Sequence, residues 1–146
     1  MANISELEKR IATTNDAGLI AMLLERLIDN FNSCKAAIGN KDDDTVRNLN
    51  DNSRDILNEL IFQFSGSDDI SIAIREICVF VNKLITEGQV KRDASEFDDS
   101  IRVLTPMLEG FKELEVRDVP KAVTGITYGK GALEEYAIKG NRTFKG

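Results

Sequence analysis

The spacing of apolar residues over the first 115 or so positions is the feature that most constrains the fold of this chain. Apolar side chains recur at steps of three and four residues, which places them along one face of an α-helix. Four successive segments show this pattern: residues 19–38, 46–64, 70–85 and 97–114. Because only a few residues separate the segments, we expect an all-α fold, an antiparallel four-helix bundle.

Polar and helix-breaking residues at the segment boundaries support the same division. Residues that suit a helix N-terminus precede three of the segments: Asp42, Asp43 and Asp44 at the second, Asp68 or Asp69 at the third, and Asp93 or Ser95 at the fourth. Glycine is a common helix terminator, so we expect the third helix to end near Gly88. Pro106 lies inside the fourth segment and predicts a kink there, because proline removes one helical hydrogen bond.

The two ends of the chain differ from the bundle. We expect residues 1–116 to form one helical domain that includes a short N-terminal helical segment at residues 4–11, followed by a partly ordered tail at residues 117–146. The tail is basic and contains glycines, with a formal charge of +3 against −9 for residues 1–116. The tail either docks on the acidic domain or is a solvated terminus.

Composition excludes several classes of function. The chain has no histidine, which argues against nucleophilic triads and common zinc sites, and no motif predicts a cofactor; we therefore expect no enzyme activity and no cofactor. Cys34 and Cys78 lie in apolar stripes and are expected to be core residues. A net charge of −6 argues against a nucleic-acid partner. No run approaches the roughly 18–20 apolar residues of a membrane span, so we expect a cytoplasmic protein without membrane insertion.

The third and fourth helices carry more apolar residues than a four-helix seam needs, which indicates either another packed element or a groove for a protein partner. The candidate binding residues are Ile61, Phe64, Ile72, Val79 and Phe80. Each of them has the alternative of belonging to the core. The N-terminal segment has a spacing suited to covering such a groove, through Ile4, Leu7 and Ile11. The apolar residues of the tail are the other candidate cover: Val123, Ile126, Tyr128, Leu133 and Tyr136.

Several segments resemble the FliS family of flagellar secretion chaperones in their order and spacing. Residues 19–42 resemble the first long helix of that family, with Leu-Ile-Ala-Met-Leu at its start and Ala-Ile-Gly-Asn-Lys-Asp at its end. Ile-Leu-Asn-Glu-Leu at residues 56–60 is similar to the Ile-Ile-x-Glu-Leu of the second helix. Residues 77–93 fit the third helix, and the resemblance covers about residues 13–114.

This resemblance implies a function that the composition alone does not indicate. A FliS-like protein is a cytoplasmic chaperone that binds the disordered C-terminal segment of flagellin, prevents its premature polymerisation and presents it to the flagellar export gate. The resemblance therefore implies that residues 1–116 are a chaperone domain whose function needs no cofactor. The alternative is a helical adaptor or regulatory protein-binding module of another pathway.

Overall fold

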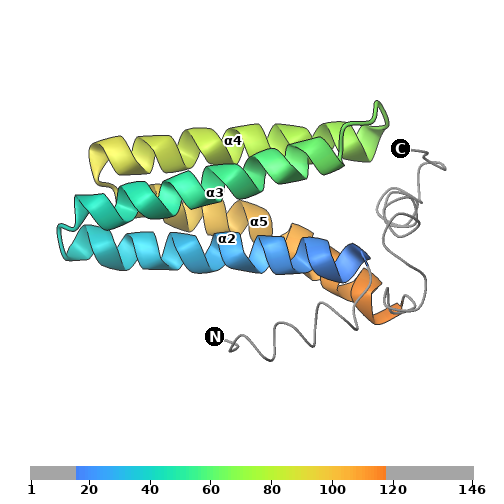
Figure 1. Ribbon diagram of the computed structural model, residues 1–146, viewed down its shortest axis with the longest axis horizontal. Helices are drawn as coiled ribbons and strands as arrows, with labels where there is room; N and C mark the ends of the chain where they lie inside the picture. The colour runs from blue at the N-terminus through green and yellow to red at the C-terminus, as the bar shows by residue number, and fades with distance from the viewer. Residues whose placement is uncertain (1–15, 118–146) are drawn as a thin grey trace.

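The computed structural model describes residues 16–117 of the chain, which form four α-helices. The helices are α2 (Asp16–Gly39), α3 (Asp43–Gln63), α4 (Asp69–Lys91) and α5 (Ala94–Arg117). About nine-tenths of these residues are helical and none of them forms a strand. Successive helices run antiparallel (Figure 1), joined by residues 40–42, 64–68 and 92–93. The prediction of an all-α antiparallel four-helix bundle is confirmed. The predicted N-terminal helical segment and the tail lie outside the described residues.

The helices pack in a ring that follows their order in the chain. Helix α2 packs against α3 and α5, and α4 also packs against α3 and α5. Helices α2 and α4 therefore lie diagonally across the bundle, with α3 and α5 between them (Figure 1). As a consequence, the outer face of α4 points away from α2.

Aspartate side chains cap the helices at the positions that the sequence indicated. Asp42 and Asp68 each accept a hydrogen bond from the backbone N–H three residues further on, at 3.2 and 3.0 Å. Asp93 accepts one from the N–H two residues further on, at 2.9 Å. Hydrogen bonds from Thr45 hold the pKa of Asp42 below its usual value, because they favour the charged carboxylate. The caps satisfy N–H groups that a helix start otherwise leaves without partners.

Helix α4 does not end near Gly88, as the sequence suggested, but continues to Lys91. Gly88 is buried, and a Cβ atom at this position would lie 2.7 Å from the ring of Phe97 on α5. The glycine thus allows α4 and α5 to approach closely, and it is not a terminator. The helix is instead capped by Arg92, which follows Lys91 and has a left-handed φ of 52°.

Proline at position 106 does not end the fourth helix. Helix α5 continues past Pro106 to Arg117. The predicted kink at this residue stays a prediction.

The core contains two aromatic contacts between helices that are distant in sequence. The rings of Phe31 on α2 and Phe97 on α5 lie 6.0 Å apart, and those of Phe64 and Phe111 lie 5.9 Å apart in an edge-on arrangement. All four rings are buried in a continuous apolar cluster that every helix supplies. Both cysteines are buried in this cluster, which confirms that they are core residues.

A layer of hydrogen-bonded polar side chains crosses the core between α2, α3 and α4. Asn30 donates to the hydroxyl of Ser53 at 3.0 Å. Asn50, which is fully buried, donates to the backbone oxygen of Ile85 at 3.0 Å and to the side-chain oxygen of Gln89 at 2.9 Å. Buried polar groups are costly unless they are paired. These bonds therefore favour the helix register in which each donor meets its acceptor.

Candidate protein-binding surface

The outer face of α4 carries apolar side chains that the bundle does not cover. Val79 is 62% exposed, Phe80 48% and Ile72 37%. Glu76 and Lys83 lie on the same face and are exposed as well. We call these five residues the α4 ridge. Their spacing of three and four residues keeps them on one side of the helix, opposite to the stripe that faces the core.

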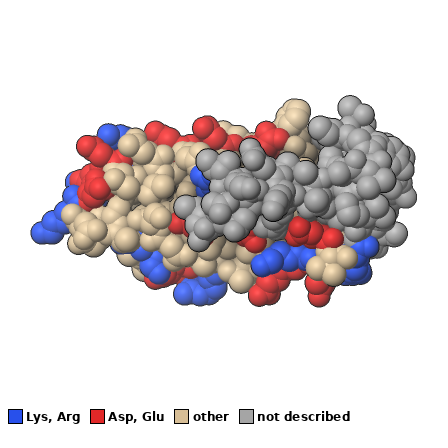
Figure 2. All heavy atoms as spheres, turned by 60° about the horizontal axis from the view of Figure 1, so that its bottom comes forward, with Lys and Arg blue, Asp and Glu red and all other residues tan. Residues whose placement is uncertain are grey.

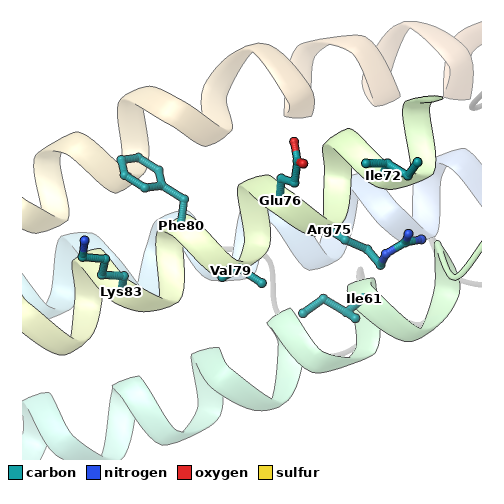
Figure 3. A pocket seen from close by; sticks show the side chains of 7 residues that line it. All are labelled: Ile61, Ile72, Arg75, Glu76, Val79, Phe80 and Lys83. Carbon is teal, nitrogen blue, oxygen red and sulfur yellow. The ribbon is translucent and has the colours of Figure 1, made fainter.

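An open groove runs along this ridge. It has a volume of about 620 Å³ and is lined by the ridge, by Arg75 of α4 and by Ile61 of α3. Figure 3 shows Ile61 and Arg75 on the side of α4 that faces α3, with Ile72 and Lys83 towards opposite ends of the groove. The lining is mainly apolar with a few charged groups, as in the grooves that accept an amphipathic helix.

Of the charged lining residues, Arg75 is held by the fold. Its guanidinium donates to the backbone oxygens of Phe64 and Gly66, at 2.5 and 2.7 Å, and so fixes the connection between α3 and α4. Neither Glu76 nor Lys83 forms an ion pair with another residue of the four described helices. These two charges therefore remain available to a partner.

Three of the five candidate binding residues are exposed on the ridge, as the sequence predicted: Ile72, Val79 and Phe80. Ile61 is half-buried at the edge of the groove. The prediction of an exposed Phe64 is wrong, because this side chain is only 1% exposed. Phe64 follows Leu57 and Leu60 at helical spacing and continues their buried stripe. The candidate cover residues Ile4, Leu7 and Ile11 and those of the tail lie outside the described residues.

The charged groove residues Arg75, Glu76 and Lys83 were not among the residues predicted from the sequence. The sequence does contain a signal for Glu76 and Lys83, because positions 72, 76, 79 and 83 follow the same steps of three and four residues as the core stripe. Arg75 has no such signal, because its acceptors are backbone atoms of a loop. Further exposed apolar side chains were also missed: Phe62, Val90 and Val116.

Charge, metal-binding groups and hydropathy characterise the other described residues. On the face seen in Figure 2, the Lys and Arg side chains of the described residues lie among Asp and Glu side chains, without a continuous basic patch. Between residues 16 and 117, no group of three or more His, Cys, Asp or Glu side chains is placed to hold a metal ion. No helix in this part of the chain is both long and apolar enough to cross a membrane.

Comparison with known proteins identifies the family. No curated protein matches the chain. A family model described as flagellar protein FliS matches residues 1–118, which is most of the sequence and includes the four helices of the described residues. The chain therefore belongs to the FliS family of flagellar proteins.

Proposed function

We propose that this protein is a cytoplasmic chaperone whose α4 ridge and adjoining Ile61 bind the disordered C-terminal segment of flagellin. Binding would prevent premature polymerisation of flagellin and assist its delivery to the flagellar export gate. FliS is a family of flagellar export chaperones and not of enzymes, which supports the chaperone role. The observation that carries the proposed site is the open apolar groove between α3 and α4.

The physical basis is the folding of a disordered segment on an apolar surface. Val79 and Phe80 present apolar area that water solvates poorly, and an amphipathic helix laid along the groove removes that area from water. Ordering the segment opposes binding, which keeps the affinity lower than the contact area alone suggests. A limited affinity allows a chaperone to release its client at the export gate.

Replacing Val79 with aspartate is expected to weaken binding of a flagellin C-terminal peptide at least tenfold. The new carboxylate would be buried without a partner when the peptide covers the ridge, and a tenfold loss corresponds to about 1.4 kcal/mol. The unfolding free energy is expected to change by less than about 0.5 kcal/mol, because Val79 is exposed in the free protein. Fluorescence anisotropy of a labelled peptide and urea denaturation measure the two quantities.

The matched control is Val116→Asp, which makes the same substitution at an exposed position near the end of α5. We expect it to bind the peptide like the unmodified chain. Equal weakening by both variants would place the binding site elsewhere. A lack of binding by the unmodified chain at micromolar concentrations would contradict the flagellin proposal and favour an adaptor for another partner.

We further propose that residues 1–12 cover the α4 ridge in the free protein through Ile4, Leu7 and Ile11. A bound cover lowers the apparent affinity for the client by the fraction of molecules that are open, about tenfold if nine-tenths are closed. Deleting residues 1–12 is therefore expected to tighten peptide binding. Replacing the three apolar residues with serine keeps the length and should have the same effect, and unchanged affinity in both variants would rule out the cover.

A further inference from the structure

A second hollow continues the groove along the contact between α3 and α4. It has a volume of about 230 Å³, and two of its lining residues, Ile61 and Val79, also line the groove described above. Buried Leu57 and Cys78 form its apolar floor. The other lining residues are polar: Arg54, Asn58 and Asn82. The groove is thus apolar beside the α4 ridge and becomes polar farther towards the C-terminal end of α4.

Arg54 organises the polar part of this hollow. Its guanidinium donates to the side-chain oxygen of Asn82 at 3.2 Å and to the hydroxyl of Thr86 at 3.0 Å. It also donates to the side-chain oxygen of Gln89 at 3.5 Å, and the buried Asn50 donates to the same oxygen at 2.9 Å. Arg54 and the buried polar layer therefore form one hydrogen-bonded network, which fixes the orientation of the Asn82 side chain.

This orientation leaves one donor of Asn82 unused by the bundle. Because the carboxamide oxygen accepts from Arg54, the NH₂ group must point to the other side. Among residues 16–117 no acceptor bonds this NH₂ group, and the carboxamide of Asn58 on the α3 side of the hollow forms no hydrogen bond with them either. Both asparagines are exposed and can be solvated in the free protein. A client that covers the hollow removes that water.

We propose that Asn82 fixes the register of the client in the groove by donating a hydrogen bond to a side-chain oxygen of the bound helix. This inference rests on the proposed function and adds the chemistry that the client must carry, which is one Asp, Glu, Asn or Gln in an otherwise apolar face. Asn82 follows Val79 by three residues, or about 4.5 Å of helix rise. The acceptor therefore lies about one helical turn from the client side chain that covers Val79.

The cost of a missing acceptor makes this contact selective. A client with only apolar side chains at this point would bury the NH₂ group without a partner, which costs more than the hydrogen bond itself contributes. A client shifted by one turn would bear the same penalty, as a single buried asparagine specifies the register of a coiled coil. The apolar contacts at Val79 and Ile61 thus provide affinity, whereas Asn82 sets the alignment.

Alanine substitutions on both sides of this hydrogen bond test the proposal. Each Asp, Glu, Asn and Gln of a flagellin C-terminal peptide is replaced in turn, and fluorescence anisotropy measures binding to the unmodified chain and to Asn82→Ala. We expect one peptide substitution to weaken binding to the unmodified chain about fivefold and to have no further effect on Asn82→Ala. The matched control Asn48→Ala removes an exposed asparagine of α3 that does not line the groove, and should bind every peptide as the unmodified chain does.

Asn82→Asp separates recognition from a structural role. The new carboxylate still accepts from Arg54 and forms an ion pair with it, so the free energy of unfolding should not fall. The free donor, however, is replaced by an acceptor. With a carboxylate in the client, binding should weaken more than in Asn82→Ala, because like charges then meet. With an amide in the client, the loss should be no larger than in Asn82→Ala, because the amide can turn its own NH₂ group towards the aspartate.

Arg54→Met tests whether Arg54 is the positioning residue for Asn82. Methionine retains an apolar stem but has no donor, so the carboxamide of Asn82 is no longer held in one orientation. The pair of alanine substitutions, at Asn82 and in the peptide, is repeated in this background. The coupling between the two positions should fall, although Asn82 itself is present. A purely structural role of Arg54 would weaken all peptides equally and leave the coupling unchanged.

The outcomes distinguish this inference from the proposed function. Peptide binding that Val79→Asp weakens, but that Asn82→Ala and Asn82→Asp leave unchanged, would overturn the register contact alone. Peptide substitutions whose effects are all independent of position 82 would do so as well. Absence of peptide binding to the unmodified chain would overturn the proposed function and, with it, this inference.

Discussion

Replacing Phe64 with alanine is expected to lower the free energy of unfolding by about 3–5 kcal/mol. The ring is 1% exposed and lies edge-on to Phe111 at 5.9 Å, so it joins the end of α3 to α5. Truncation removes the transfer free energy of the ring and leaves a cavity that neighbouring side chains fill only in part. Urea denaturation measures the effect as a lower midpoint with an unchanged slope.

The same substitution at Phe80 is the control. Its ring is 48% exposed on the α4 ridge, so Phe80→Ala is expected to cost less than about 1 kcal/mol. The two variants thus separate a core phenylalanine from a surface one, although the sequence presents both as candidates for the groove. Similar losses at the two positions would show that Phe64 is not the core residue described above.

Replacing Gly88 with alanine is expected to destabilise the bundle by about 1–3 kcal/mol, although alanine is the better helix former. The added Cβ atom would lie 2.7 and 3.0 Å from two carbon atoms of the Phe97 ring and 3.1 Å from the Cβ atom of Glu96. Phe97 is fully buried, so its ring has no room to turn aside without displacing other core side chains. Helices α4 and α5 must therefore move apart, and thermal or urea denaturation measures the cost.

Gly110→Ala provides the opposite expectation within the same fold. Gly110 is exposed inside α5, and a Cβ atom there meets nothing within 4 Å. The substitution is expected to stabilise the protein by about 0.5–1 kcal/mol, since alanine loses less conformational freedom in a helix. If Gly88→Ala also stabilised the protein, the close approach of α4 and α5 would not exist in solution.

The architecture could be predicted from the sequence because each helix of a four-helix bundle is specified by residues close to it in the chain. The helical periodicity, and the aspartates at Asp42, Asp68 and Asp93, act within a few residues of the elements that they define. The prediction failed at Gly88 because glycine favours both helix ends and close helix packing. Which of these applies depends on Phe97, a residue of another helix that no local pattern links to it.

The candidate site was less predictable for a related reason. Whether an apolar residue faces the groove or the core depends on the rotation of its helix, and an excess of apolar residues does not fix that rotation. Val79 and Phe80 lie outside the core stripe of α4, whereas Phe64 continues the core stripe of α3. The groove also depends on Arg75, whose bonds to loop oxygens exist only once α3 and α4 are packed.

The two buried thiols, Cys34 and Cys78, can be used to detect local unfolding of the bundle. Burial raises the pKa of Cys34 to about 11 and that of Cys78 to about 12, so at neutral pH both are protonated and shielded from reagents. A thiol-specific label therefore reacts only when part of the bundle opens. Because α2 and α4 lie diagonally in the bundle, the labelling rates of Cys34 and Cys78 report the exposure of its two opposite sides separately, without an engineered cysteine.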